Sequence, residues 1–211
     1  MKITCIGHSG FLVELPEYNL IFDYFTDKKS VITPEIFKDK ITCVFVSHSH
    51  HDHYNQKIFD WNSWGNIIYI LDSGCNVGAR IARPLDGKII KVREGDNFDI
   101  LDGAINVKTY GSTDEGVSFL VTAGESVIFH AGDLNDWYWE DESTPEELIE
   151  YEENYINIIK KLAGQRIDIA FIPQDPKLGR NAGRGIKYFK EIVAPERIIA
   201  MHFSGNSGTI Y

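Results

Sequence analysis

The sequence predicts an α/β (α+β) chain in which short, mostly antiparallel strands fill the first half and helices enter in the second. Short apolar or alternating runs recur over residues 1–130, and pairs such as Asp102-Gly103 separate them as turns. From Leu148 to Leu162, apolar side chains recur at a helical period. We see no repeat, low-complexity segment or linker, so we expect one compact domain over residues 1–211.

Each expected element follows from its local pattern. Thr144 as N-cap, Pro145 at the first helical position and Glu147 as the partner of the cap predict a helix start, and Gly164 predicts its end. A second helix over residues 185–193 ends before Pro195. The expected strands are residues 1–6, 10–15, 19–23, 41–47, 66–71, 88–92, 98–101, 105–110, 117–122, 126–130, 167–173 and 197–203.

Composition excludes some classes of protein. The 211 residues are 43% hydrophobic, enough for a substantial core, and carry a formal net charge of -10. That charge disfavours a protein that grips nucleic-acid phosphates, so we expect a small-molecule substrate as partner. No apolar run reaches transmembrane length, and residues 1–6 lack the features of a signal peptide, so a cytoplasmic location is the expectation. The oligomeric state is left open.

A cluster of ligand-type residues follows the β-prone run 41–47. His48, His50, Asp52 and His53 lie within six positions, on the loop expected to leave that strand. Imidazoles suit zinc, iron and manganese, and a carboxylate helps to hold a second ion. His51 lies between the alternating positions and is expected to point elsewhere. The alternative is a surface loop that is histidine-rich by accident, but such a loop would not need the preceding strand.

These residues and others carry a family resemblance. The segment from Ser47 to His53 resembles the signature motif of the metallo-β-lactamase-fold superfamily. Residues 6–11 with 21–23 resemble the opening of its lactonase-like, metal-dependent hydrolase branch. Residues 129–133 and 200–203 resemble the strands that deliver its bridging aspartate and final histidine. The resemblance implies a four-layer αββα sandwich, the metallo-β-lactamase fold.

The resemblance also implies roles for the matching residues. His48 and His50 would bind a first metal ion. A second ion would be bound by Asp52, His53 and His202. Asp133 would bridge the two ions, and Asp52 could help to orient the nucleophile, so these two are the catalytic candidates. Zinc, as one or two ions, is the expected cofactor, with iron or manganese as alternatives.

Two further histidines are outer candidates. His8 and His130 would orient ligands or touch the substrate. For His130, which ends an apolar strand, the alternative is that it only caps that strand.

One family position is different in this chain. The third histidine of the first metal site is missing, because Ser112 stands at its place in the stretch 111–116. Three outcomes are open: Asp114 substitutes as a ligand, water fills a weak first site, or one ion is held chiefly by the second site. The last two together are favoured. Residues 111–116 could also be only a hairpin turn.

Two other segments have a functional and a structural interpretation. Trp137-Tyr138-Trp139 could form a substrate wall, or pack the following acidic helix onto the domain. The glycine- and arginine-rich residues 179–185 could bind an anion, or form a turn with solvated arginines.

The sequence therefore predicts a metal-dependent hydrolase that uses a metal-activated water on a small ester, lactone, amide or phosphoester. A non-catalytic metal-binding or ligand-sensing domain with a degenerate site is the alternative. An iron-dependent oxidoreductase is less favoured.

Overall fold

The computed structural model describes residues 1–85 and 87–203. They form two compact units, one running to Arg93 and the other beginning at Glu94. Each unit contains one six-stranded sheet with its own helical segments, so the expected α/β class is confirmed. The expectation of a single domain over residues 1–211 stays a prediction.

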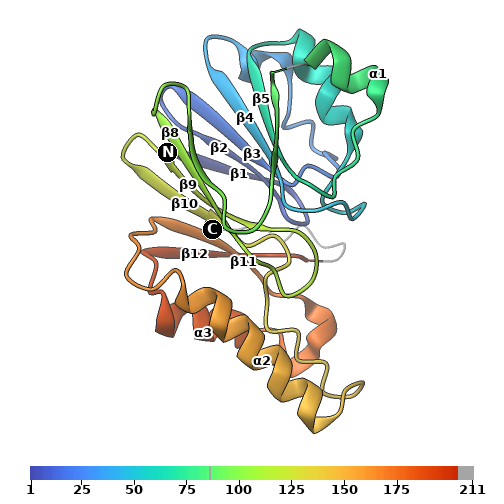
Figure 1. The fold of residues 1–211 in the computed structure, drawn as a ribbon, viewed down its shortest axis with the longest axis vertical. Helices are drawn as coiled ribbons and strands as arrows, with labels where there is room; N and C mark the ends of the chain where they lie inside the picture. The colour runs from blue at the N-terminus through green and yellow to red at the C-terminus, as the bar shows by residue number, and fades with distance from the viewer. Residues whose placement is uncertain (86, 204–211) are drawn as a thin grey trace. The chain divides into compact units, whose positions relative to one another are not determined.

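In the first unit the strands follow one another across the sheet in chain order (Figure 1). The first two pairings are antiparallel and the remaining three are parallel. The strands are β1 (Lys2–Gly7), β2 (Gly10–Glu14), β3 (Tyr18–Phe22), β4 (Ile41–Val46), β5 (Ile67–Asp72) and β6 (Ile89–Val92).

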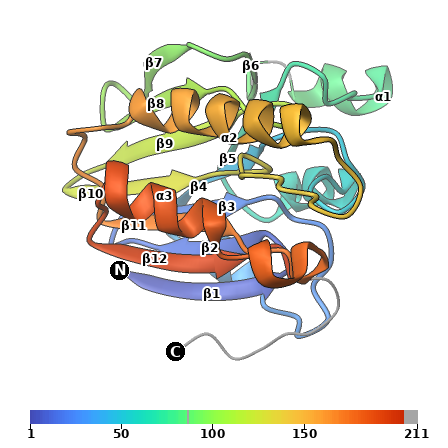
Figure 2. The same cartoon turned by 90° about the horizontal axis from the view of Figure 1, so that it is seen from below.

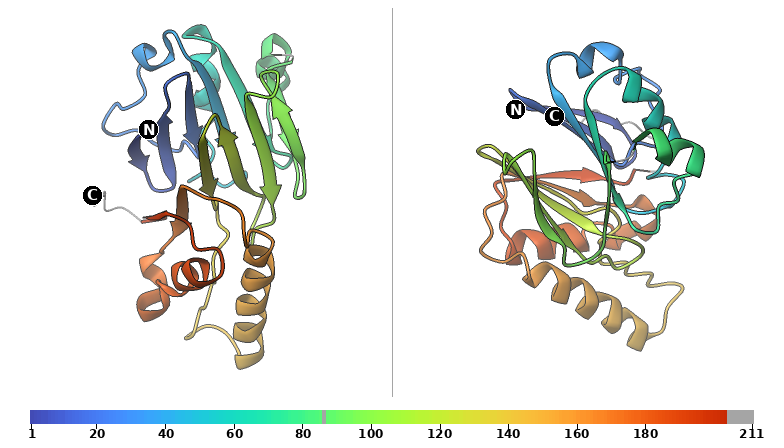
Figure 3. Two further views of the ribbon diagram at one scale, coloured as in Figure 1. Left: turned by 90° about the vertical axis from the view of Figure 1, so that its left-hand side faces the viewer. Right: turned by 45° about the horizontal axis from the view of Figure 1, so that its top comes forward.

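Short helical segments connect the parallel strands of the first unit and pack on its sheet (Figure 3). Trp61 lies at the centre of this layer, with its ring 4.7 Å from that of Tyr24 and 5.7 Å from that of Phe37. These segments are absent from the sequence-based expectations because each is too short to show a sustained helical period. They are η1 (Pro34–Phe37), η2 (Gln56–Ser63), α1 (Ala79–Ala82) and η3 (Arg83–Leu85).

The second unit has the strand order β12-β11-β10-β9-β8-β7. Figures 1 and 2 show its two long helices side by side on one face of this sheet. The strands are β7 (Asn97–Ile100), β8 (Ile105–Tyr110), β9 (Ser118–Ala123), β10 (Ser126–His130), β11 (Ile169–Pro173) and β12 (Arg197–Met201). The helices are α2 (Pro145–Lys160), η4 (Pro176–Asn181) and α3 (Arg184–Ile192).

Capping and packing fix these helices. The predicted capping box is confirmed: Thr144 accepts from the Glu147 N–H while the Glu147 carboxylate accepts from the Thr144 N–H. Phe189 of α3 is fully buried and stacks on Phe129 of β10 at 5.2 Å, a contact that stabilises the fold by about 2–3 kcal/mol through burial. In the described part of the chain, no helix has the length and apolar character needed to cross a membrane.

The expectation of mostly antiparallel strands is wrong. Among residues 1–85 and 87–203, five of the ten strand pairings are parallel, three in the first sheet and two in the second. Parallel neighbours require a crossover connection. Here every such connection contains a helical segment, from η1 between β3 and β4 to α3 between β11 and β12. The short segments of the first unit were not predicted, so its crossovers could not be recognised.

Candidate functional site

In the first unit, two parallel strands end beside each other. Phe22 of β3 pairs with Phe45 of β4, so the carboxyl ends of these strands lie at one edge of the sheet. Asp23 follows β3 directly, and its N–H donates to the Phe45 carbonyl at 2.9 Å. Its φ of 41° is left-handed, a conformation that costs a non-glycine residue about 1 kcal/mol. The histidine-rich segment leaves β4 at the same edge.

Asp23 organises this segment. Its buried carboxylate accepts from the Ser47 N–H at 2.8 Å, the Ser47 hydroxyl at 2.7 Å and His53 Nδ1 at 2.8 Å. Because a carboxylate can only accept, His53 must carry its proton on Nδ1. In the neutral ring, Nε2 then holds the lone pair that can bind a metal ion.

The Ser47 hydroxyl in turn determines the tautomer of His48. The hydroxyl has one proton, which it donates to Asp23. Toward His48 Nδ1, 2.9 Å away, it can therefore only accept, so Nδ1 of His48 is also protonated. His48 and His53 are both fully buried and present Nε2 as the potential ligand atom.

The histidine rings lie close together. The ring centroid of His48 is 4.1 Å from that of His53 and 4.6 Å from that of His50. Neutral imidazole is the form that binds metal ions, so rings at this spacing are candidate ligands of one site.

His8 and Asp52 complete the group in the first unit. His8, in the turn between β1 and β2 and with φ of 49°, has its Nε2 3.3 Å from Asp52 Oδ2 and its ring centroid 5.6 Å from that of His53. His51 lies apart, as expected, because its side chain is 90% exposed. The structure thus brings together all five candidates that fall in this unit: His8, His48, His50, Asp52 and His53.

In the second unit, three parallel strands deliver three further residues. Asp133, Asp175 and His202 follow β10, β11 and β12, which are neighbours in the sheet. His202 Nδ1 is 3.1 Å from Asp175 Oδ2, and its Nε2 is 3.3 Å from Asp133 Oδ1. If the Asp175 carboxylate accepts the proton on His202 Nδ1, then His202 Nε2 and Asp133 Oδ1 are both acceptor atoms, and they face each other at 3.3 Å. A cation held between them would stabilise that arrangement.

An ion pair between Arg184 and Asp136 stabilises the turn that follows Asp133. Arg184 at the start of α3 lies 2.7 Å from the fully buried Asp136 carboxylate, and its guanidinium is 3.8 Å from the ring centroid of Tyr138. Burial raises the pKa of Asp136, and Arg184 opposes that shift. Trp137 is held in the same turn, since its Nε1 donates to the Asp133 carbonyl at 2.9 Å and its ring lies 5.5 Å from that of His202.

His130 is the last residue of β10. The ring is fully buried, and its Nδ1 accepts from the Gly132 N–H at 3.2 Å. That contact shapes the turn between β10 and Asp133, in which Gly132 has φ of 56°.

The stretch with the missing histidine lies beside the Asp133 turn. Thr113 donates to the Asn135 carbonyl at 2.6 Å and accepts from the Asn135 N–H at 2.9 Å. Ser112, the residue at the histidine position, accepts from the Asp114 N–H at 3.2 Å, and Asp114 is exposed. The stretch forms a turn, and it is Thr113 that joins it to the turn of Asp133.

Three residues of these networks carried no predicted role: Asp23, Ser47 and Asp175. Asp23 and Asp175 each follow a strand whose parallel neighbour ends near a histidine, and Ser47 directly precedes His48. An Asp or Ser directly after a buried run is the signal that could have found them, had the strand order been known.

An α/β fold that carries histidines and carboxylates at the ends of its strands offers residue types that can bind a metal ion. The family model described as beta-lactamase superfamily domain matches residues 2–147, and the chain belongs to this family. Curated relatives of the chain are named as metal-dependent hydrolases. One from Hyperthermus butylicus, named UPF0173 metal-dependent hydrolase, is 23% identical over 62% of this chain and 60% of its own length. One from Bacillus subtilis, UPF0173 metal-dependent hydrolase YtkL, is 31% identical over 63% of each chain. The chain thus spans about three fifths of the length of these two relatives.

A solved structure supports the fold. Igni18, described as a novel metallo hydrolase from Ignicoccus hospitalis, has a TM-score of 0.63 and 16% identity, with 96% of this chain and 82% of that chain covered. The metallo-β-lactamase fold implied by the sequence is confirmed.

Proposed function

We propose that the chain hydrolyses a small-molecule ester, lactone, amide or phosphoester with a metal-activated water. The candidate metal ligands are His48, His50, Asp52, His53, Asp133 and His202. The observation that carries the proposal is the shared orientation of three of these histidines. His48, His53 and His202 each contact a side-chain oxygen through Nδ1, from Ser47, Asp23 and Asp175 respectively, which leaves Nε2 as the potential ligand atom. Histidine ligands of metal ions are commonly held in this way, with the other ring nitrogen bonded to an oxygen.

The donor set fits a divalent transition metal. Imidazole nitrogens with carboxylate oxygens suit zinc, which we propose as the cofactor, and also iron and manganese. When bound, the ion polarises the scissile group and lowers the pKa of a water. Asp52, beside His8 at 3.3 Å, orients the attacking water, while Asp23 and Asp175 keep two histidine rings in position.

The replaced histidine sets the expected number of ions. With Ser112 engaged in a turn and Asp114 exposed, we propose one firmly held ion, chiefly on Asp52, His53, Asp133 and His202. A single ion supplies Lewis-acid activation but no symmetric clamp on a phosphodiester, so esters and lactones are the preferred substrates.

Elemental analysis of the tag-free protein tests the metal site. We expect about one ion per chain in the wild type, and loss of that ion in His202→Ala and His53→Ala. His51→Ala is the matched control, because it removes an exposed histidine from the same loop. Two ions per chain, reduced to one by Asp114→Ala, would favour the substituted first site. No ion after metal reconstitution would contradict the proposal.

Hydrolysis is tested with aryl esters, lactones, an anilide and a phosphodiester. Asp133→Ala should abolish any turnover and His51→Ala should preserve it. Turnover that survives Asp133→Ala would refute the metal mechanism. Bound metal with no turnover would favour the non-catalytic module. Bound iron with oxygen consumption would favour the oxidoreductase.

A further inference from the structure

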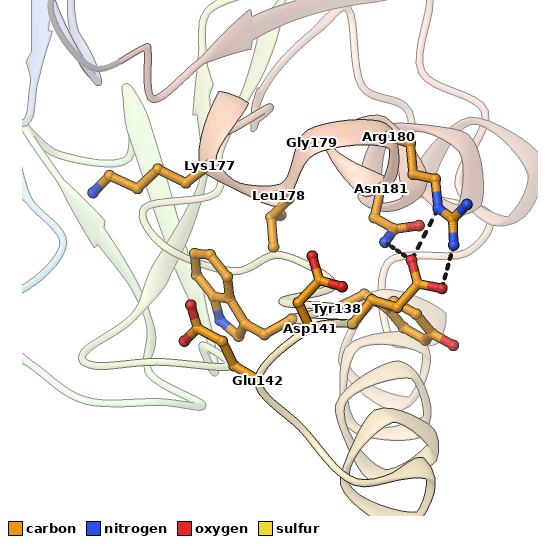
Figure 4. Close-up of a pocket in the computed structure, with 10 residues that line it drawn as sticks. Tyr138, Asp141, Glu142, Lys177, Leu178, Gly179, Arg180 and Asn181 are labelled. Atoms are coloured by element: carbon orange, nitrogen blue, oxygen red, sulfur yellow. Dashed lines mark hydrogen bonds and ion pairs between the residues drawn. The ribbon is translucent and has the colours of Figure 1, made fainter.

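A recess of about 470 Å³ lies in the second unit, between the segment that follows Asp133 and the η4 turn (Figure 4). Its volume is in the range of small-molecule sites. One wall is Tyr138 to Glu142 and the other is Lys177 to Asn181, so it joins the two segments whose roles the sequence left open.

An ion pair closes one end of the recess. Arg180 Nε donates to the Glu140 carboxylate at 2.9 Å, and Asn181 donates to the same group at 3.0 Å. Dashed lines in Figure 4 mark these contacts of Arg180 and Asn181. This pairing raises the pKa of Arg180, and Asp141 adds to the effect at longer range. The Arg180 charge is therefore largely matched by Glu140, which disfavours the anion site considered for this loop.

The remaining lining is apolar and acidic. Leu178 is buried and Trp139 is half-buried. Asp141 and Glu142 are exposed and have no hydrogen-bonded or ion-paired partner for their carboxylates among residues 1–85 and 87–203. Lys177 is the other cation of the lining, and Figure 4 shows it pointing away from Asp141. The interior combines an aromatic face, an aliphatic side chain and two carboxylates.

This combination of side chains favours one class of ligand. We propose that the recess binds an organic cation, an alkylated or protonated amine whose charge is spread over carbon-bearing groups. Such a cation gains from the face of an indole and from nearby carboxylates, while its alkyl groups contact Leu178. A hard ion such as Ca²⁺ needs only the oxygens and would not depend on Trp139.

The position of the recess suggests which molecule carries this cation. Trp139 lies nearly parallel to Trp137, with ring centroids 6.0 Å apart, and Trp137 lies 5.5 Å from the ring of His202. The recess is thus two aromatic rings away from a proposed metal ligand in the same unit. Resting on the proposed function, the substrate is an ester or related compound with a cationic group about two ring spacings from the bond that is cleaved.

Calorimetric titration of the purified full chain with choline tests the recess, with 3,3-dimethylbutan-1-ol as the neutral molecule of the same shape. Choline should bind at least about tenfold more tightly than the alcohol, because only choline has the charge. Trp139→Leu, which keeps an apolar side chain but removes the ring, should weaken choline about fivefold or more, and Trp139→Phe should weaken it less.

The double variant Asp141→Asn/Glu142→Gln should weaken choline about tenfold. Both residues are exposed, so the variant is expected to fold. Glu150→Gln/Glu153→Gln is the matched control, since it makes the same charge change at exposed positions of α2 and should leave binding unchanged. Equal affinity for choline and the alcohol, equal loss in both double variants, or no binding of choline overturns the proposal.

Turnover tests the substrate assignment separately. The Asp141→Asn/Glu142→Gln variant should raise KM for acetylcholine and leave KM for 3,3-dimethylbutyl acetate unchanged. Identical kcat/KM for the two esters overturns the assignment. Binding does not require turnover, so an inactive protein that selects choline contradicts only the hydrolase proposal. An active protein that does not select choline contradicts only the recess.

Discussion

Replacing Asp23 by asparagine should invert the protonation of two histidines without removing the side chain. The carboxylate accepts three hydrogen bonds, from the Ser47 N–H at 2.8 Å, the Ser47 hydroxyl at 2.7 Å and His53 Nδ1 at 2.8 Å. Asparagine fits the same space and tolerates the left-handed φ of 41°. All three contacts survive only if its oxygen accepts from the Ser47 N–H and its NH₂ donates to the other two atoms.

That arrangement has a direct consequence for the histidines. His53 Nδ1 becomes an acceptor, and the Ser47 hydroxyl now donates to His48 Nδ1, so both rings move their proton to Nε2. Three charge-assisted bonds become neutral ones at about 1 kcal/mol each, which predicts a loss of about 2–3 kcal/mol in the free energy of unfolding of the metal-free protein. Metal affinity should fall about 10- to 100-fold.

Three measurements test the prediction for Asp23→Asn. Urea unfolding gives the stability, competition with a chromogenic chelator gives the metal affinity, and ¹⁵N NMR of the imidazoles reports the tautomers. Asp27→Asn is the matched control, because Asp27 accepts from the N–H groups of Val31 and Ile32 at 2.8 and 2.7 Å in the same unit. It should lower stability and leave metal affinity unchanged. Equal metal affinities in the two variants, or unchanged tautomers in Asp23→Asn, would refute the reasoning.

Three further predictions concern other parts of the chain. Asp175→Asn should keep the cap on η4, since asparagine is an equally good N-cap, but it should turn an NH₂ group toward His202. Chelator competition should then show a metal affinity about 10- to 100-fold lower, while the free energy of unfolding stays within about 1 kcal/mol of wild type. Arg184→Ala should cost about 3 kcal/mol in urea unfolding, because it leaves the fully buried Asp136 carboxylate without its ion pair; a loss below about 1 kcal/mol would contradict this. Burial raises the pKa of the Cys43 thiol to about 12, so the thiol stays protonated at neutral pH and should react with Ellman's reagent only after unfolding.

The strands and the long helices could be predicted from sequence because their signals are local. Apolar runs bounded by turn residues mark the strands, and the Thr144–Glu147 capping box marks the start of α2. Strand direction could not be predicted, since it depends on what joins the strands. η2 is only eight residues long, so its pattern gave no period from which a crossover could be inferred.

The residues of the candidate site also fall into those that a local sequence pattern identifies and those that it does not. His48, His50, Asp52 and His53 are close in sequence, and their spacing alone marks them as ligands. The aspartates that orient His53 and His202 are far from them in sequence. Asp23 contacts His53 across 30 positions, and Asp175 contacts His202 across 27. No local pattern encodes such a pair, because the contact exists only after parallel strands are placed side by side.

In both units an aspartate holds a histidine in position through the same arrangement of strands. In each, an aspartate that follows one strand fixes a histidine that follows its parallel neighbour: Asp23 for His53 in the first unit and Asp175 for His202 in the second. Parallel strands make this possible because their carboxyl ends share an edge. Asp23 and His202 both have left-handed φ, at 41° and 68°, a strained conformation that persists only where surrounding contacts hold it. The strain thus falls on one residue of the arrangement in each unit, the aspartate in the first and the histidine in the second, and in each it lies in the pair that fixes a candidate metal ligand.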